Sequence, residues 1–596
     1  MKPNTSDDPV SYPELQGTAL QQGLWGLIKN RQYSFKLLQQ DATAALIVTL
    51  LLIPQSLAYA LLAGLPLQAG LYASILPAIA YALVGSSGIL AVGPVAITSL
   101  LTYSALSPHA TPGSSEFLVL AILLALMSGL CLLLMGSLRM GFLANFLSHP
   151  VMSAFVSASA VIIVLGQLKG ITAIPIESGS LQQLLWSLLT NLDELHLLTL
   201  FLGLGFVVFL FFARHYLAGY LIRWGLSFSA ASLLARMAPL VLLVVAVLMV
   251  ALGDLNQKGV RIVGELPVGF PQLALPSITG QVLWSLVPMA IMISLIGFAE
   301  SIAIARTFAA KRRQQVNSNR ELLGLGFANL ASGVSGAFPV TGGLSRTVVN
   351  YDAGAVTPLA SLLTGLGMLL VLLFFTGWLY YLPQAMLSAV IIVAVISLID
   401  WQQLPYLWRY SRGDAWAWLA TASGVLFLGL ELGLLLGVLV SLAAWLAKNS
   451  RPHMAVVGRV PGTEHYRNVQ RYQVEVDPRI LSLRIDESLM FANAQEVEQR
   501  VLTEISQRTS VRHVILMGSG INHIDASGVE MLEELNLLLK EQEISLHFSE
   551  IKGPVLDRLE NSHLLSALTG QVFLTQHQAV QALMTAKPPR PEQLSS

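Results

Sequence analysis

Two short breaks interrupt the apolar, membrane-length stretches of this sequence, one in each half of its hydrophobic region. The first break is Val92–Pro94 and the second is Phe338–Gly343. Inside a bilayer every backbone N–H and C=O group needs a partner, so a broken helix is stable only where protein encloses it around a cavity. Breaks at corresponding places in two halves are typical of a transporter whose substrate binds near the membrane midplane.

A permanent cation follows the second break. Leu344, Ser345 and Arg346 come directly after it, at the expected start of a helix. A helix N-terminus favours negative charge, and a guanidinium group can bind two oxygens at once, so these residues predict an anion site. The alternative is a structural ion pair between Arg346 and a carboxylate such as Glu300, because an unpaired cation at this depth is costly.

The composition predicts a polytopic α-helical membrane protein. Of the 596 residues, 54% are hydrophobic and only 11% are charged, whereas soluble domains have roughly 25% charged residues. Between Asp41 and Arg139 the single acidic or basic residue is Glu116. From about Lys448 onward charged residues become frequent, which indicates a soluble C-terminal part.

Apolar windows divide the hydrophobic region into fourteen predicted membrane segments. The two windows that begin at the breaks are short, and they are the third and the tenth, which are matching positions in two sets of seven. Because seven is odd, the second set must cross the membrane in the opposite sense, which predicts a 7+7 inverted-repeat fold with two half-helices. The windows are 42–62, 66–84, 89–104, 117–137, 150–168, 195–213, 236–252, 283–304, 321–336, 341–351, 357–376, 384–399, 414–430 and 432–447.

The distribution of basic residues predicts that both termini are cytoplasmic. With this orientation the loops after segments four, six, eight, twelve and fourteen face the cytoplasm, where basic residues gather. The predicted outer loops carry Glu116, Lys169, Glu177, Asp193, Glu194 and a segment of mixed charge at 253–282. The predicted cytoplasmic loops carry Arg139; Arg214, Arg223 and Arg236; Arg306, Lys311, Arg312, Arg313 and Arg320; Arg409 and Arg412; and Lys448 and Arg451.

After about Arg471 the pattern changes to a small α/β domain. Strands are expected at 480–485, 511–517 and 544–549, and helices at 494–505 and 527–540. The predicted organisation is a cytoplasmic N-terminal extension (1–40), a transmembrane transport domain (41–448), a linker (449–470), the α/β domain (471–585) and a disordered tail (586–596).

These motifs resemble the sulfate permease (SulP) family of anion transporters. The α/β domain resembles the cytoplasmic STAS module of that family through Asp525–Gly528. The membrane motifs that carry the resemblance are Asp41, Ile53–Ala60, Ala63–Pro66, Ala91–Ala96, the run from Glu300 through Asn319–Leu322 to Thr341–Thr347, and Ala353–Ala355.

The resemblance implies a homodimer in which each chain has a mobile core and a gate, with elevator-like movement of the core. The anion would bind between the facing N-termini of segments three and ten. In this family an aromatic residue often precedes the Ser-Arg pair, and here Leu344 replaces it, which leaves the choice of anion open. The implied substrate-binding residues are Gln55, Tyr59, Gly93, Val95, Ala96, Gly343, Leu344, Ser345 and Arg346.

The spacing of residues around Pro54 gives independent but weaker support for part of this set. Gln55 and Tyr59 are four residues apart and so share one helix face, beside a proline that breaks the helical ladder. A purely structural role, in which Gln55 satisfies freed backbone and Tyr59 packs in the core, remains the alternative.

Two further residues have candidate roles. Glu300 is the expected coupling residue, neutralised by a proton or a sodium ion, and an ion pair with Arg306 is its structural alternative. Ser527 matches a serine that is phosphorylated in related soluble antagonist domains, and capping of the following helix is its structural alternative.

The sequence therefore predicts a secondary-active inorganic anion transporter of a bacterial-type inner (plasma) membrane, with sulfate uptake coupled to protons or sodium. The open alternatives are a bicarbonate or C4-dicarboxylate symporter, an anion exchanger or channel-like conductor, a nucleobase permease and a signalling receptor. We expect no enzyme, because no H-E-x-x-H, G-x-S-x-G or Walker A pattern occurs. No cofactor, metal site or nucleic-acid partner is expected, whereas a cytoplasmic regulator at the STAS domain is a candidate partner.

Overall fold

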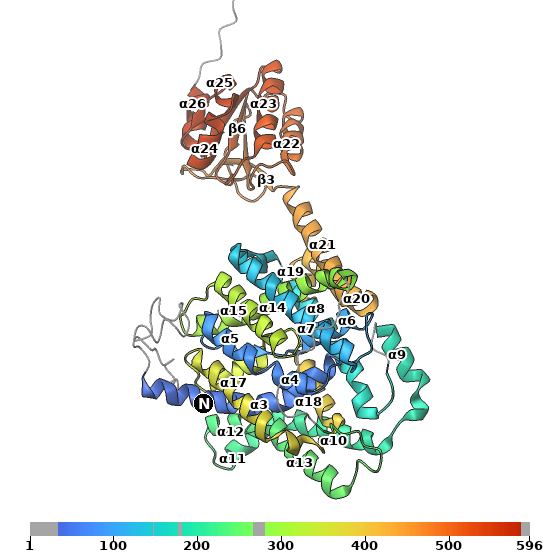
Figure 1. The fold of residues 1–596 in the computed structure, drawn as a ribbon. Helices are drawn as coiled ribbons and strands as arrows, with labels where there is room; N and C mark the ends of the chain where they lie inside the picture. The colour runs from blue at the N-terminus through green and yellow to red at the C-terminus, as the bar shows by residue number, and fades with distance from the viewer. Residues whose placement is uncertain (1–33, 147, 177–180, 266–279, 586–596) are drawn as a thin grey trace, which may run out of the picture. The chain divides into compact units, whose positions relative to one another are not determined.

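The computed structural model describes residues 34–146, 148–176, 181–265 and 280–585 (Figure 1). It divides into two compact units, with the boundary between Ser441 and Leu442. Residues 1–33 of the predicted N-terminal extension, Glu177 of a predicted outer loop and the predicted tail (586–596) lie outside the described residues.

The first half of the N-terminal unit is helical except for one very short strand. Apolar side chains dominate these helices, as the hydropathy of the sequence predicts. The elements are α3 (Phe35–Leu62), α4 (Gln68–Tyr72), α5 (Leu76–Val84), β1 (Val92–Gly93), α6 (Ala96–Leu106), α7 (Ser115–Ser137), η2 (Gly141–Phe146), α8 (His149–Thr172), α9 (Leu181–Thr190), η3 (Leu192–Glu194), α10 (Leu197–Phe212), the π-helical turn η4 (Ala213–Leu217), α11 (Ala218–Arg223), α12 (Phe228–Arg236) and α13 (Ala238–Gly253).

The second half repeats this pattern of long helices around one short strand. Its elements are α14 (Gly280–Lys311), α15 (Ser318–Val334), β2 (Thr341–Gly342), α16 (Leu344–Asp352), α17 (Leu359–Phe374), η5 (Thr376–Leu379), α18 (Gln384–Ile396), α19 (Gln403–Tyr410), α20 (Arg412–Leu428) and α21 (Leu430–Asn449).

Six helices of the described residues are long and apolar enough to cross a membrane, or seven if a bent pair at 230–253 forms one span. A helix also lies in each of the fourteen predicted windows, although the number that cross the membrane stays a prediction. Two predicted boundaries are too narrow. Helix α3 begins at Phe35 rather than near Asp41, and the apolar stretch of α10 continues through η4 to Arg223.

The helices of the N-terminal unit pack in two groups (Figure 1). In one group α15 packs on α7 and α5, and α17 packs on α3 and α5. In the other, α8 packs on α18 and α20, and α10 packs on α18. Helices α3 and α6 touch both groups, through contacts of α3 with α18 and of α6 with α8, so they lie where the groups meet.

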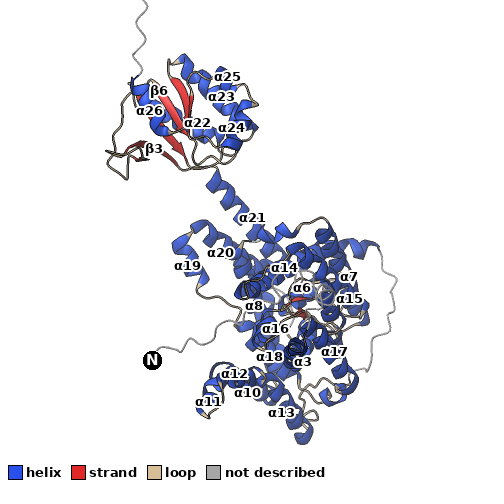
Figure 2. Cartoon of the chain, turned by 90° about the vertical axis from the view of Figure 1, so that its left-hand side faces the viewer, coloured by secondary structure: helices blue, strands red, loops and turns tan. Residues whose placement is uncertain are grey.

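The two sequence breaks lie side by side at the centre of this unit. Val92 pairs with Gly342 and Gly93 pairs with Thr341 in a two-residue antiparallel ladder between β1 and β2. Figure 2 shows these two short strands in red among the helices. The N–H group of Gly343 also donates to the carbonyl of Ala91 at 3.1 Å. The prediction that the breaks meet is therefore confirmed.

Buried side chains satisfy the backbone that the second break frees. Asn329 accepts from the N–H group of Val340 at 3.0 Å and donates to its carbonyl at 2.9 Å. The hydroxyl of Ser301 accepts from the N–H group of Gly342 at 2.9 Å, and the hydroxyl of Thr341 donates to the carbonyl of Gly297 at 2.7 Å. These contacts provide the internal partners that an interrupted helix needs in a bilayer.

Two fully buried carboxylates fasten distant segments to each other. Asp41 accepts from the N–H groups of Val356 and Thr357 at 2.7 and 3.1 Å, next to the start of α17. Glu321 accepts from the hydroxyls of Tyr81 and Ser86 at 2.7 and 2.6 Å, just before the first break. Because both carboxylates are satisfied by hydrogen bonds, they can be buried in an apolar core.

The C-terminal unit is an α/β sandwich around a six-stranded sheet in the order β4-β3-β5-β6-β7-β8. Strands β5 to β8 are parallel, whereas β3 is antiparallel to β4 and β5. The predicted helices and the three predicted strands are confirmed. The elements are β3 (Met454–Arg459), β4 (Tyr466–Asn468), β5 (Ile480–Ile485), α22 (Ala494–Ser506), β6 (His513–Met517), α23 (Ala526–Glu541), β7 (Ser545–Ser549), α24 (Gly553–Glu560), α25 (Leu564–Ala567), β8 (Val572–Phe573) and α26 (Gln576–Thr585).

Two predictions for this unit are wrong. The predicted linker (449–470) contains β3 and β4, because its short apolar run buries alternate residues against the sheet. Ser527 does not cap α23. Asp525 does, since its carboxylate accepts from the N–H group of Gly528 at 2.9 Å while also accepting from that of Phe491 at 2.9 Å. Ser527 is half-buried in the first turn of α23.

A buried histidine predicts acid sensitivity of the C-terminal unit. Burial, and then the neighbouring His513, lower the pKa of His547 from 6.5 to about 4, and His547 Nδ1 accepts from the N–H group of Gln571 at 3.0 Å. Below pH 6.5 the unfolded chain therefore binds a proton at His547, whereas the folded domain keeps this side chain neutral until the pH approaches 4. The free energy of unfolding falls as the pH drops from 6.5 towards 4. We expect the urea midpoint of a fragment covering 450–585 to fall between pH 7.5 and pH 5.5.

His547→Gln should flatten this pH dependence. His563→Gln, a control at an exposed histidine of the same unit, should retain it. An equal fall in the His547→Gln fragment would contradict the assignment.

Candidate functional site

A cavity of about 500 Å³ lies at the facing starts of α6 and α16 in the N-terminal unit. It brings together every predicted substrate-binding and ion-coupling residue except Gly93. The predicted residues that line it are Gln55, Tyr59, Val95, Ala96, Glu300, Gly343, Leu344, Ser345 and Arg346.

Arg346 connects the two half-helices. Its side chain is only 2% exposed, and its Nη1 atom donates to the carbonyl of Pro94 at 2.8 Å. Its Nη2 atom is buried without a hydrogen-bond partner in the structure. A guanidinium with one N–H group anchored to protein and another unsatisfied beside a cavity is suited to bind an oxyanion.

Neither helix start is capped by a side chain. Val95 and Gly343 are the N-cap residues of α6 and α16, and neither side chain accepts a hydrogen bond from its helix. The first N–H groups of a helix have no intrahelical acceptor. Since Leu344 and Ser345 are exposed and line the cavity, the start of α16 offers free donors and a positive dipole end to a bound anion.

The glycines of the breaks make room for the guanidinium. A Cβ atom on Gly93 would lie 2.9 Å from Nη1 of Arg346, and one on Gly343 would lie 2.8 Å from Nη2. Gly93 therefore belongs to the site although it does not line the cavity. Any other residue at either position would push the guanidinium away from its place.

We expect Gly343→Ala to raise the KM for the transported anion on the order of 10–100-fold, because small misplacements of a binding group have effects of this size. The protein should still fold, since the side-chain end of Arg346 can move. The measurement is anion uptake beside Gly205→Ala, a control on α10 where a Cβ atom would meet nothing within 4 Å. Equal KM values in the two variants would contradict the packing argument.

Helix α3 supplies the polar wall opposite Arg346. The helix continues through Pro54, and Gln55 and Tyr59 line the cavity from one face of it. Their exposed fractions are 6% and 8%. The predicted shared face is confirmed, and both side chains can contact a small ligand, although such contact stays a prediction.

Glu300 lies in the same cavity as Arg346 without a direct salt bridge to it. Its Oε2 atom is buried and has no hydrogen-bond partner in the structure, while its charge interacts with that of Arg346 through space. None of the salt bridges of the described residues joins Glu300 to Arg306, and Arg306 donates to the hydroxyl of Ser318 at 2.8 Å. A half-buried carboxylate with one buried oxygen that lacks a partner is suited to accept a proton or a cation.

The sequence did not predict three polar groups of this site. Arg214 and Arg236 line the cavity as additional cations. Arg214 donates to the carbonyl of Val393 at 2.9 Å, and Arg236 forms a 2.5 Å salt bridge to Asp352 at the end of α16. The third group is the carbonyl of Pro94. In the sequence, Arg214 and Arg236 were evidence only that their loop is cytoplasmic. No local sequence pattern indicates that they lie near Arg346.

No group of three or more His, Cys, Asp or Glu side chains that could hold a metal ion occurs in the part of the chain that the structure describes. The charged and dipolar groups of the cavity are the guanidinium groups of Arg346, Arg214 and Arg236, two helix N-termini and the carboxylate of Glu300.

Comparison with known sequences identifies two families along the chain. Residues 38–421 match the sulfate permease family and residues 471–579 match the STAS domain. The chloroplastic sulfate transporter 4.1 of Arabidopsis thaliana is 35% identical over 564 residues, which cover 91% of this chain and 80% of that protein. A probable sulfate transporter of Mycobacterium tuberculosis is 33% identical over 560 residues, covering 94% and 97%.

Solved structures share the fold at lower identity. The murine solute carrier 26 family member A9 anion transporter, in its inward-facing state, matches with a TM-score of 0.86 and 22% identity over 98% of this chain and 97% of that one. The transmembrane domain of a cyanobacterial bicarbonate transporter matches with a TM-score of 0.55 and 22% identity, over 69% and 98%. These two likenesses concern the fold alone.

Proposed function

The chain belongs to the sulfate permease family, and we propose on that basis that it carries inorganic oxyanions, sulfate first among them, across a membrane. It is an integral membrane protein of a family of transporters rather than enzymes. The observation that supports an anion most strongly is the buried guanidinium of Arg346, which has an unsatisfied N–H group beside two uncapped helix starts.

The mechanism follows from the position of the cavity between the two helix groups. An anion bound by Arg346, Ser345 and the first turns of α6 and α16 touches the group that contains α3, α15 and α17, and faces the group that contains α8, α10 and α18. Elevator-like movement of the first group against the second would expose the anion to each side of the membrane in turn.

Glu300 is the proposed coupling residue. When it is ionised, it opposes the entry of an anion into the same cavity, because like charges repel strongly where water is scarce. Binding of a proton or sodium ion removes this repulsion, so cation and anion would enter together. Symport is therefore the proposed mode, with exchange or channel-like conduction as the alternative.

The proposed setting is the inner (plasma) membrane, with both termini in the cytoplasm and two chains in a homodimer. With this orientation Arg214 and Arg236, which line the cavity, lie in a cytoplasmic loop, where basic residues gather. The C-terminal STAS domain, with Ser527 half-buried on α23, is the proposed docking place of a cytoplasmic regulator.

A bicarbonate or C4-dicarboxylate substrate is the second candidate. Leu344 is 44% exposed and lines the cavity, and an apolar side chain there can contact the carbon chain of a dicarboxylate better than it can contact sulfate.

The test is uptake by the purified full chain in liposomes under separate proton and sodium gradients. We expect labelled sulfate to accumulate and unlabelled sulfate to compete better than bicarbonate or succinate. Uptake of succinate or bicarbonate without any sulfate uptake would reassign the substrate, and electrical current without accumulation would indicate a channel-like conductor.

A further inference from the structure

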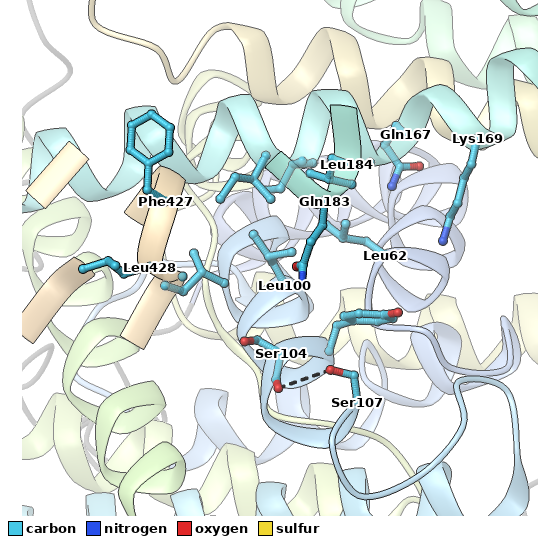
Figure 3. A pocket seen from close by; sticks show the side chains of 16 residues that line it. Leu62, Leu100, Ser104, Ser107, Gln167, Lys169, Gln183, Leu184, Phe427 and Leu428 are labelled. Atoms are coloured by element: carbon cyan, nitrogen blue, oxygen red, sulfur yellow. Dashed lines mark hydrogen bonds between the residues drawn. The ribbon is translucent and has the colours of Figure 1, made fainter. Parts of the chain in front are cut away.

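A second cavity, of about 350 Å³, lies in the N-terminal unit beside the site described above. Its volume corresponds to roughly ten water molecules at about 30 Å³ each, so it has room for a hydrated anion. Figure 3 shows that α8 supplies Gln167 and Lys169, that α9 supplies Gln183, and that Ser104 and Ser107 lie on the other side.

The two cavities follow each other along the same two helices. On α6 the first cavity is lined by Ala96 and the second begins at Leu100. On α3 the corresponding residues are Tyr59 and Leu62. One helical turn rises about 5.4 Å, so only about one turn of each helix separates the cavities. They are separate cavities, and their positions along both helices are those expected of successive parts of one path.

The second cavity lies at helix ends that the predicted topology places on the opposite side of the membrane from the loop of Arg214 and Arg236. Its lining includes the ends of α6 and α8 and the junction of α20 and α21 at Leu428. In the predicted topology these helix ends face the outside, whereas Arg214 and Arg236 of the first cavity lie in a cytoplasmic loop. The second cavity is therefore the outer part of the path.

Lys169 is the one charged side chain of this lining, as far as the described residues go. Gln167, beside it on α8, is 2% exposed and accepts from the hydroxyl of Ser388 at 3.0 Å. Hydroxyl and amide groups face the lysine across the cavity. Glu431 follows the lining residue Leu430 on α21, but it is exposed and outside the lining. The charge of this cavity is thus positive.

We propose that the second cavity is an outer capture site for the transported oxyanion, with Lys169 as the cation that attracts it. The inference rests on the proposed anion transport and adds a second anion-binding site, which serves the outer side of the membrane only. A compact ammonium with flexible donors holds an anion less firmly than a guanidinium fork does. Lys169 would thus concentrate the anion at the outer entrance and release it to Arg346 when the path opens.

The test compares transport from the two sides of the membrane by the full chain. Labelled sulfate uptake is measured in intact cells for the outer side and in inside-out vesicles for the inner side. Because one charge attracts a divalent anion through partly hydrated surroundings, we expect Lys169→Gln to raise the outer half-saturation concentration about three- to tenfold. The inner value should change less than the measurement error, which also shows that the variant folds.

Two further variants sharpen the result. Lys169→Arg should keep most of the outer affinity, and Lys258→Gln, at an exposed lysine outside the lining, should change neither side. The effect of Lys169→Gln should shrink at high ionic strength, since salt screens the attraction.

An unchanged outer half-saturation concentration in Lys169→Gln would overturn the capture site. An equal rise of the half-saturation concentration on both sides would also overturn the capture site, as would a lower maximal rate with unchanged half-saturation concentrations. Either result would mean that Lys169 affects the movement of the carrier rather than the binding of the anion at the outer side. The absence of sulfate transport in the unmodified protein from either side would instead refute the proposed function.

Discussion

Replacement of Arg346 by alanine is expected to reduce anion uptake on the order of 100-fold or more, while the protein remains expressed and folded. Removing one partner of a buried charged contact typically costs about 2–5 kcal/mol. Arg346 is the cation at the meeting point of the two half-helices, and it also holds the carbonyl of Pro94. Its loss removes the anion's guanidinium contact and the cation whose charge interacts with that of Glu300.

Lysine should rescue Arg346 poorly. An ammonium cannot donate to the carbonyl of Pro94 and to two oxygens of an anion with the geometry of a planar fork. Arg306→Ala is the matched control, because Arg306 is exposed and donates to Ser318 outside the cavity. The measurement is initial uptake at low sulfate concentration, with thermal unfolding as the check on folding. Normal uptake by Arg346→Ala would contradict the site.

Glu300→Gln is expected to abolish accumulation and to spare exchange. Glutamine keeps the size and most polar contacts of the side chain but carries no charge for a proton or sodium ion to neutralise. The variant should bind the anion at least as well as the unmodified protein, since the repulsion in the cavity is gone. Exchange of internal for external anion should persist, because it does not require the empty carrier to return.

Both activities are measured in the same liposomes, under an inward proton gradient and then under an inward sodium gradient. The gradient whose effect is lost in Glu300→Gln identifies the coupling ion. Glu116→Gln, at an exposed carboxylate in the first turn of α7, should accumulate the anion normally. Undiminished accumulation by Glu300→Gln under both gradients would remove Glu300 from the mechanism.

The broken helices were the part of the site that the sequence predicted best. A Gly/Pro break in an apolar stretch has a local cause, and its consequence in a bilayer follows from backbone hydrogen bonding alone. The pairing of Val92 with Gly342 and the cavity around Arg346 confirm that the two breaks meet. The strands and helices of the C-terminal unit were predictable for the same reason, since their alternating or helical apolar periods are local.

Contacts between distant residues were not predictable in this way. The acceptor of Arg346 is the carbonyl of Pro94, 252 positions away in the sequence. The carboxylates of Asp41 and Glu321 bind segments 235 to 316 positions away. The residues within one helical turn of either carboxylate do not indicate whether it holds two segments together or serves the substrate site. The hydrogen bonds that hold the segments together are visible only in the folded chain.

The errors in the C-terminal unit have equally specific causes. The apolar run of β3 covers only Met454–Val457 before Gly458 and Arg459, and β4 is three residues long, so the stretch resembled a linker. At the start of α23 both Asp525 and Ser527 are residue types that cap helices. The residue at which α23 begins decides which of the two caps the helix. Helix boundaries are the least certain part of a prediction from sequence.

The central claim is that an oxyanion binds between the starts of α6 and α16, against Arg346. The most direct measurement is anomalous X-ray diffraction from crystals of the full chain grown with selenate, which has the shape and charge of sulfate and a strong anomalous scatterer. The account predicts an anomalous peak within hydrogen-bonding reach of the Arg346 guanidinium and of the first N–H groups of α16. Saturating selenate that leaves this position empty, while a peak appears elsewhere in the membrane unit, would contradict it.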